Sequence, residues 1–184
     1  HAGHVSEQHL AALRRGNAVT RSWRRLEAAA CRAIEGSPVV LTVLRPPAVV
    51  ARGRGDAFSR LFAGRLAFVL PGFDPSLQLL AASDLARAVV RVMETGAAGV
   101  YHLAPSAVVP LRQALETARC RRLPVPLSVQ WLPRKLLAPR RAAPLDQLDY
   151  LRHGSTVSAE KIRRELDFEP LYASADAVRR ATGA

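Results

Sequence analysis

The sequence predicts an α/β fold in which short parallel strands alternate with helices. Short apolar runs rich in Val and Leu recur along the chain, and such runs are typical of strands covered on both faces. Between them lie longer segments whose apolar residues repeat every three or four positions, the period of an amphipathic helix. Proline or glycine stands at most of the junctions, where these residues end strands and helices.

The first elements expected are a helix over 17–35 and a strand over 39–44. The apolar stripe of the helix consists of Val19, Trp23, Leu26, Ala30 and Ile34. On this stripe we expect Trp23 to be core or helix-packing material rather than a stacking platform for a ligand. The strand is expected to end at Arg45-Pro46-Pro47, because proline lacks the N–H that a sheet needs.

The middle of the chain continues the alternation. The expected elements are a helix over 56–63, a strand over 66–70, an extended piece over 77–80, a helix from Ser83 to Gly96 and a strand over 100–104. Ser83 is the expected N-cap of the long helix, and Gly96 ends it. The inward stripe of this helix is expected to consist of Leu85, Ala88, Val89, Val92 and Met93.

Two polar residues in this region have simple structural interpretations. Asp84 lies near a helix N-terminus, where capping and the helix dipole favour a carboxylate. His102 lies on a strand, and we expect a hydrogen-bonded residue of the sheet rather than an acid or a base.

The last third of the chain is expected to be mixed. Helical patterns cover 111–118, 158–166 and 173–181, whereas prolines between Leu123 and Pro144 predict irregular structure with one short helix near 128–137. Paired basic residues stand at 121–122, 134–135 and 140–141. We expect them to be solvated, with contact to a nucleotide diphosphate or to acidic lipid headgroups as the alternative.

Composition limits the function classes. The 184 residues are 49% hydrophobic, enough for a core, and no apolar run approaches the ~18 residues that span a bilayer. The net charge of +12 usually suggests nucleic acid. However, only Lys135 and Lys161 among the 27 basic residues are lysines, and the arginines are dispersed in ones and twos. We interpret this as a compositional bias, with generic, salt-sensitive binding of polyanions as its consequence.

Cysteines and histidines point to neither a disulfide framework nor a metal site. Cys31 and Cys120 both fall in segments that the sequence pattern predicts as helix, which makes a disulfide framework unlikely and favours a reducing, cytoplasmic setting. The histidines near the start of the chain are His1, His4 and His9. We expect them to be solvated, since no carboxylate or cysteine stands at ligand spacing from them.

Four segments carry a resemblance to a known family. They are Leu44-Arg45-Pro46 after an apolar strand, Leu77-Gln78-Leu79-Leu80-Ala81-Ala82-Ser83-Asp84-Leu85-Ala86, Gly99-Val100-Tyr101-His102-Leu103-Ala104, and Leu166-Asp167-Phe168-Glu169-Pro170. In this order they resemble the C-terminal half of the extended short-chain dehydrogenase/reductase family, the NAD(P)-dependent sugar epimerases and dehydratases.

The resemblance implies that 1–184 is a single partial domain. It would hold the late strands and helices of a Rossmann-like NAD(P)-binding fold, interleaved with a small substrate-covering subdomain. The glycine-motif half is absent from this sequence, and Gly53 and Gly55 do not replace it because Phe58 occupies the third glycine position. The implied cofactor is NAD or NADP, and the implied partner is a nucleotide sugar or a related small molecule. A homodimer or a fusion to another domain is also implied, without a specific nucleic-acid partner or membrane insertion.

The resemblance also implies that this sequence lacks the Tyr/Lys catalytic pair of the family. Its Tyr-x-x-x-Lys precedes a Glu by four residues, so that anchoring on Glu27 places Trp23 at the Lys position and Val19 at the Tyr position. Valine has no ionisable proton, and indole has no charge that would lower a tyrosine pKa. Ala81 likewise replaces the usual His. We therefore assign no catalytic residue and predict little or no redox turnover.

The cofactor contacts expected within this chain follow the first strand. Ligands of open α/β sheets bind outside the carboxyl ends of the strands, which points to a short stretch here. Its residues are Arg45, Pro46, Pro47, Ala48 and Val49. The alternative is that the prolines only terminate the strand.

Three functional hypotheses remain open. The first is the C-terminal part of an NAD(P)-dependent nucleotide-sugar epimerase/dehydratase-like protein with a degenerate Tyr/Lys pair. The second is a non-enzymatic NAD(P)-sensing or docking module, and the third is generic polyanion or nucleic-acid binding.

Overall fold

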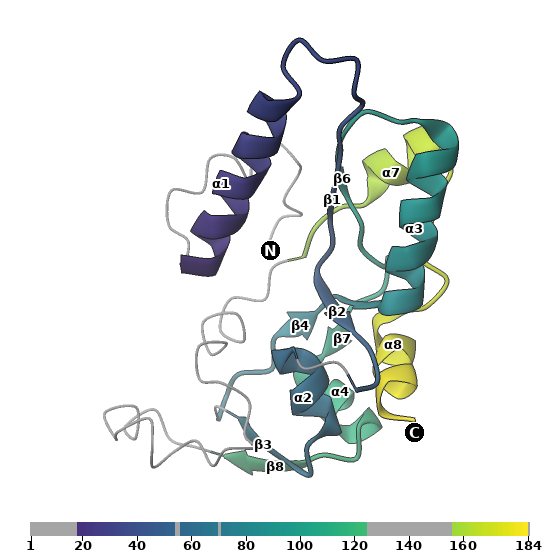
Figure 1. Cartoon of the computed structure of the whole chain (residues 1–184). Coiled ribbons are helices and arrows are strands. Elements are labelled where there is room, and N and C mark those ends of the chain that lie inside the picture. Colours follow the sequence, from purple (N-terminus) through teal and green to yellow (C-terminus); the bar gives the residue numbers. More distant parts are fainter. Residues whose placement is uncertain (1–17, 54–55, 70, 125–155, 184) are drawn as a thin grey trace.

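The computed structural model describes residues 18–53, 56–69, 71–124 and 156–183 (Figure 1). Helices and strands lie close to the positions that the sequence predicts. In chain order they are α1 (Ala18–Ala33), β1 (Thr42–Arg45), β2 (Ala48–Val50), α2 (Ala57–Ala63), β3 (Leu66–Val69), β4 (Ser76–Leu77), β5 (Leu79–Ala81), α3 (Ala82–Thr95), β6 (Gly99–His102), β7 (Val109–Pro110), α4 (Leu111–Thr117), β8 (Arg121–Pro124), α7 (Glu160–Leu166) and α8 (Ser174–Thr182).

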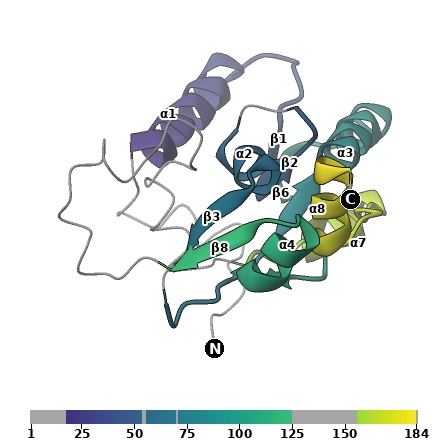
Figure 2. The ribbon, with the colours of Figure 1, turned by 90° about the horizontal axis from the view of Figure 1, so that it is seen from below.

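Parallel pairing dominates the strands, which confirms the predicted α/β class. β1 pairs with β6, β2 with β5, and β3 with β8, all parallel, whereas β4 and β7 are antiparallel. Each parallel partner is reached through a long connection, as parallel strands require. Figure 1 shows α1 on one side of the β1–β6 pair and α3 and α7 on the other. Seen from below, β3 and β8 lie side by side, and α4 leads into β8 (Figure 2).

Two buried clusters form the interior. The first joins α2, α4 and α8 to the short strands through Phe62, Leu77, Leu115 and Val178. The second packs α3 and α7 against β5 and β6; its members are Leu80, Ala88, Tyr101, Leu103, Ile162, Leu166 and Phe168. The middle of the chain and its C-terminal helices are therefore held together by apolar burial.

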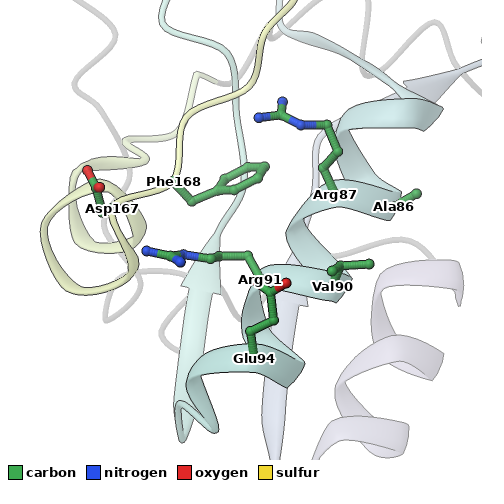
Figure 3. A pocket seen from close by; sticks show the side chains of 7 residues that line it. All are labelled: Ala86, Arg87, Val90, Arg91, Glu94, Asp167 and Phe168. Carbon is green, nitrogen blue, oxygen red and sulfur yellow. The ribbon is translucent and has the colours of Figure 1, made fainter.

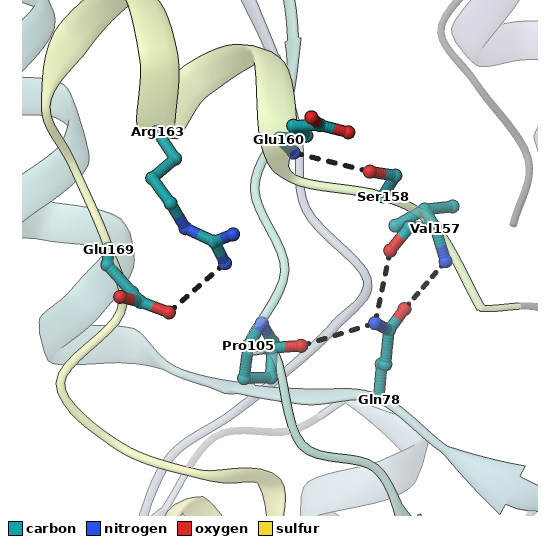
Figure 4. Close-up of polar contacts among 7 residues, drawn as sticks. All are labelled: Gln78, Pro105, Val157, Ser158, Glu160, Arg163 and Glu169. Carbon is teal, nitrogen blue, oxygen red and sulfur yellow. Dashed lines mark hydrogen bonds and ion pairs between the residues drawn. The ribbon is translucent and has the colours of Figure 1, made fainter.

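Buried polar side chains fasten the C-terminal segment to the strands. The Gln78 amide donates to the carbonyls of Pro105 at 3.2 Å and Val157 at 3.1 Å, and its oxygen accepts from the Val157 N–H at 2.8 Å (Figure 4). The Ser174 hydroxyl donates to the Ala107 carbonyl at 2.6 Å and accepts from the Leu79 N–H at 3.1 Å. Both side chains are buried, so each bond replaces contacts with water that burial removed.

The first strand is shorter and more exposed than predicted. It begins at Thr42 rather than Val39, and the side chains of Val39 and Val40 are 59% and 57% exposed. β1 is only half-buried, because within the part of the chain that the structure describes it pairs on one side alone, with β6. The prediction of a strand covered on both faces is therefore wrong for β1.

The apolar stripe of α1 does not pack in the core. Trp23 is 66% exposed and Leu26 is also exposed, so the prediction that Trp23 is core material is wrong. The helix is instead attached to the strands through a polar contact of Glu27. An amphipathic pattern predicts a helix, but it does not specify which neighbour covers the apolar side.

The long helix α3 differs from the prediction at both its cap and its stripe. Its N-cap is Ala81, because the helix follows directly on β5, and Ser83 makes no cap bond there. Gly96 ends the helix in the left-handed conformation, at a φ of 60°, as predicted. Ala88 is buried and Leu85 and Val92 pack against the second cluster, as predicted, whereas Val89 and Met93 are exposed. Asp84 is also buried on this helix.

Two further corrections concern the end of the described middle segment. Arg121–Pro124 form strand β8 rather than irregular structure, because they pair with β3. Cys120 lies between α4 and β8 and is buried, which raises the pKa of its thiol, whereas Cys31 on α1 is exposed. Both cysteines are free. The predicted helix near 128–137, the basic pairs at 134–135 and 140–141, and the three N-terminal histidines lie outside the described residues.

Candidate functional site

An ion pair joins α1 to the carboxyl end of β1. Arg45 is the last residue of β1, and its Nη2 lies 2.5 Å from Oε1 of Glu27 on α1, while its Nε donates to Oε2 at 3.2 Å. Both side chains are 24% exposed. A guanidinium that meets a carboxylate through two nitrogens has a defined orientation. The pair therefore sets the side of α1 that faces the strand end.

The stretch predicted to contact a cofactor is partly strand. Pro46 is exposed and Pro47 is half-buried at the end of β1, as the proline break predicts. The chain then resumes as β2, in which Ala48 and Val49 pair with Leu79 and Leu80. Ala48 packs against the first buried cluster and Val49 against the second. The end of β1 thus bears Pro46, Pro47 and the Arg45–Glu27 pair.

The positions that align with the catalytic pair of the resembling family lie at the start of α1. Val19 is in its first turn, and Trp23 is one turn before Glu27. Helix residues four apart share a face, so Trp23 and Glu27 lie on the same side of α1. The structure thus brings Trp23 and Glu27 to the helix face that meets the end of β1.

Three other residues that the sequence analysis considered, Ala81, Asp84 and His102, are all buried. Ala81 is buried at the end of β5, and His102 is fully buried at the end of β6, opposite Arg45 in the register. Asp84 is fully buried and accepts hydrogen bonds from the N–H groups of Leu171 and Tyr172, each at 3.1 Å, so capping and the helix dipole are not its main role. Arg87 pairs with it at 2.8 Å.

A tyrosine and a lysine do meet in this fold, at a place that the sequence did not indicate. Lys161 on α7 donates to the Val100 carbonyl at 2.9 Å, and its Nζ lies 4.4 Å from the centre of the Tyr101 ring. The Tyr101 hydroxyl donates to the Ala98 carbonyl at 3.2 Å. Burial and the nearby Glu165 carboxylate raise the pKa of Tyr101, while a hydrogen bond from Arg164 lowers the pKa of Glu165. Tyr101 and Lys161 thus join β6 to α7.

A groove of about 550 Å³ lies between α3 and the link from α7 to α8 (Figure 3). Its lining consists of Ala86, Arg87, Val90, Arg91, Glu94, Asp167 and Phe168. The Arg87 guanidinium lies 5.3 Å from the centre of the Phe168 ring, and Arg91 Nε donates to the Leu166 carbonyl at 2.7 Å. Both arginines therefore contribute to the attachment of the C-terminal segment, and the groove shares no residue with the end of β1.

The described residues offer neither a metal-binding cluster nor a membrane-spanning helix. They contain no group of three or more His, Cys, Asp or Glu side chains able to hold a metal ion. Among the same residues, no helix combines the length and the apolar character needed to cross a membrane.

Comparison with known sequences gives relatives but no function. No family model matches the chain. An uncharacterized protein of Mycobacterium tuberculosis is 28% identical over 141 residues, which is 76% of this chain but 38% of the relative. The chain thus spans about two fifths of the length of the curated relatives that it matches.

Solved structures give the fold. The UDP-glucuronic acid 4-epimerase of Bacillus cereus, in complex with NAD, matches 98% of this chain and 55% of its own at a TM-score of 0.66 and 13% identity. RMD of Pseudomonas aeruginosa, complexed with NADPH, matches 99% and 62% at a TM-score of 0.61 and 17% identity. By structure, the chain is therefore similar to about half of a chain of the NAD-dependent epimerase/dehydratase enzymes, the family that its sequence resembles.

Proposed function

We propose that the chain is the C-terminal part of an NAD(P)-dependent nucleotide-sugar epimerase/dehydratase-like protein whose Tyr/Lys pair is replaced by Val19 and Trp23. The observation that carries this proposal is the Glu27–Arg45 ion pair. It attaches the helix that bears positions 19 and 23 to the carboxyl end of a parallel strand, where open α/β sheets bind their ligands.

The domain organisation is part of the proposal. In it, residues 1–184 form one partial domain. The β1–β6 pair with α1, α3 and α7 belongs to the Rossmann-like portion, and β3 and β8 with α2 and α4 form the small substrate-covering subdomain. The division of the buried residues into two clusters supports this assignment. A cytoplasmic setting also belongs to the proposal and is supported by the two free cysteines. A second copy or a fused domain is a further partner in this scheme.

The residues at the end of β1 suit NAD or NADP in one respect. Pro46 and Trp23 offer exposed apolar surface there. Of the predicted contact residues, Arg45 would hold α1 in place, Pro46 and Pro47 would line the ligand, and Ala48 and Val49 would support them from β2. The similarity to proteins with bound NAD and NADPH supports this cofactor class.

The chemistry follows from the two replaced side chains. A nicotinamide cofactor, when bound, supplies a hydride acceptor for a sugar carbon. Transfer of that hydride from an alcohol also needs a base that removes the hydroxyl proton. Val19 has no group that accepts a proton, and Trp23 has no ammonium to lower the pKa of a neighbouring phenol. We therefore expect the protein to bind the dinucleotide and the nucleotide sugar with little or no redox turnover.

Restoring the pair tests the proposal. In the full-length protein, Val19→Tyr combined with Trp23→Lys is expected to yield NAD(P) reduction, followed at 340 nm with a panel of UDP-sugars, where the unaltered protein shows little. The matched control is Val19→Phe with Trp23→Lys, which keeps the ring and the ammonium but lacks the phenol proton. Efficient turnover by the unaltered protein would show that the pair has been placed wrongly.

The exposed indole in place of a lysine also favours a non-enzymatic NAD(P)-sensing or docking module. Tight dinucleotide binding without turnover, in the unaltered protein and in the restored variant alike, supports this version. A full-length protein that binds neither NAD(H) nor NADP(H) in calorimetry would exclude the sensor and weaken the enzyme proposal equally.

A further inference from the structure

One edge of β1 has no partner among the residues that the structure describes. The Leu103 N–H, just after β6, donates to the Arg45 carbonyl at 3.1 Å, so Arg45 directs its backbone groups toward β6. Successive residues of a strand direct these groups to opposite edges, and Thr42 and Leu44 therefore turn theirs away from β6. Within the described part of the chain, β6 is the only strand that pairs with β1. An edge of this kind is a ready template for another strand.

The chain that leads into β1 has the composition of an inner strand. From Val39 to Leu44 it is a nearly unbroken apolar run, which is typical of a strand covered on both faces. However, Val39 and Val40 are 59% and 57% exposed. The sequence therefore encodes more burial at this edge than the described residues supply.

One flank of α3 is also apolar and exposed. Val89 and Met93 stand one turn apart, and their side chains are 43% and 76% exposed. Arg91 donates to the Leu166 carbonyl at the end of α7 at 2.7 Å, which identifies the flank that meets α7. A helix advances by about 100° per residue, so Val89 and Met93 lie on the opposite flank from Arg91.

This apolar flank lies on the same side as the open edge. Lys161 of α7 donates to the Val100 carbonyl of β6 at 2.9 Å, and Leu44 of β1 packs against the cluster that α3 and α7 share. Figure 2 shows the same order in both layers, because α3 lies beyond α7 in the direction in which β1 lies beyond β6. The flank of α3 that is turned away from α7 therefore faces the side on which β1 is open.

The helix α1 and the strand β1 form the second half of a βαβ unit. α1 runs opposite to β1 and leads into it, as the helix of such a unit does (Figure 1). A βαβ unit begins with a strand parallel to the last one and most often beside it in the sheet. Since β6 takes one side of β1, the open side is the place for a strand that precedes α1.

We propose that the open edge of β1 and the flank of α3 with Val89 and Met93 form one docking surface, covered in the longer protein by a strand and a helix that precede α1. The inference rests on the proposed function, in which the chain is a C-terminal part, and adds the place where the two parts meet. The strand pairs in parallel with β1 through Thr42 and Leu44, and the helix covers Met93. The chain matches only 55% and 62% of the two solved epimerase/dehydratase-like chains, so proteins of this fold have further residues to supply both elements.

Hydrogen exchange of the full-length protein, resolved to single amides, tests the strand pairing. The amides of Thr42 and Leu44 are expected to exchange at least about a hundredfold more slowly than in an unstructured peptide, because a paired amide exchanges only when the structure opens. The Arg45 amide, which faces β6, is the internal reference. The rates are expected to stay the same on about tenfold dilution, because the partner belongs to the same polypeptide.

Oxidation by peroxide tests the covering of α3. Met93 is the only methionine among the 184 residues, so its peptide reports on this flank alone. In the full-length protein we expect its sulfoxide to form at least about tenfold more slowly than in an unstructured peptide, because a covered thioether is out of reach of the oxidant. Mass spectrometry measures both rates.

A matched pair of valine variants gives an independent readout. Val89→Asp is expected to lower the melting temperature of the full-length protein by at least about 4 °C, because a covered carboxylate is costly. Val108, beside β7, is 42% exposed and lies outside the proposed surface. Val108→Asp is therefore the control and is expected to shift the melting temperature by less than about 2 °C.

The outcomes separate this inference from the proposed function. Fast exchange at Thr42 and Leu44 together with fast oxidation of Met93 would overturn the docking surface, even in a protein that binds NAD(P). Protection that weakens on dilution would overturn it as well, because a second copy would then be the partner. Protection at both places in a protein that binds no dinucleotide would support the docking surface and refute the proposed cofactor.

Discussion

Asp84 is a buried carboxylate whose partners lie far along the chain. It stands at the start of α3, yet it accepts the N–H groups of Leu171 and Tyr172, which are 87 and 88 residues further on. Arg87 supplies the compensating charge at 2.8 Å. From the sequence, capping and dipole effects are a sufficient explanation for an acidic residue there, and only the tertiary contacts show that it fastens the segment before α8.

We expect Asp84→Ala to lower the free energy of unfolding by about 2–4 kcal/mol, because two backbone N–H groups lose their acceptor and Arg87 loses its charge partner. Urea unfolding of the full-length protein measures the loss. Asp84→Asn, which keeps one acceptor oxygen, should lose less. Asp176→Ala removes an exposed carboxylate that pairs with Arg179 and should change the free energy by less than ~0.5 kcal/mol. Equal losses at Asp84 and Asp176 would contradict this role.

At the scale of elements, local patterns predicted most helices and strands. They did not predict which side of each element is buried by its neighbours. The helical stripes of α1 and α3 and the glycine that ends α3 are encoded within a few residues. The burial of each stripe depends on partners distant in sequence, and Trp23 and Met93 are exposed despite their place on a stripe. The antiparallel pairing of β4 with β7 and the formation of β8 also depend on long-range register, which composition does not encode.

Gln78 is the contact that joins the strands to the start of the C-terminal segment. Its amide makes three hydrogen bonds, two of them with the backbone of Val157 (Figure 4). We expect Gln78→Ala to lower the free energy of unfolding by about 2–3 kcal/mol, because the amide is buried and its partners stay buried without it. Hydrogen exchange should become faster at the Val157 amide in particular.

The control for this prediction is Gln113→Ala on α4, where the glutamine is exposed. It should leave both the stability and the Val157 exchange rate near those of the unaltered protein. If Val157 exchanges at the same rate in Gln78→Ala as in the unaltered protein, the segment is held by its apolar contacts alone.

For the whole molecule, the net charge of +12 predicts attraction to polyanions in general. Within the described residues, several arginines are engaged with carboxylates, among them Arg45, Arg87, Arg122 and Arg163. This pairing agrees with the interpretation of the charge as a compositional bias rather than a phosphate-binding track.

Binding to single-stranded and duplex oligonucleotides should therefore depend steeply on salt. We expect the affinity to fall at least tenfold between about 50 and about 200 mM NaCl and to be the same for scrambled sequences, because released counterions supply the driving force. Fluorescence anisotropy measures both dependences. A sequence preference that survives high salt would instead support specific nucleic-acid recognition.

The sequence by itself determined the α/β class, the order of the elements and the resemblance to the epimerase/dehydratase family. These features depend on residues close together in the sequence or on the order of short motifs, so the amino-acid sequence alone contains them. The replacement of that family's Tyr/Lys pair by Val19 and Trp23 stays a prediction from the sequence. Only the tertiary structure decided that Glu27 binds Arg45, that Asp84 and Gln78 fasten the C-terminal segment, and that the Trp23 indole is exposed. Each of these depends on groups brought together from distant positions, because burial and hydrogen bonding are properties of the packed chain.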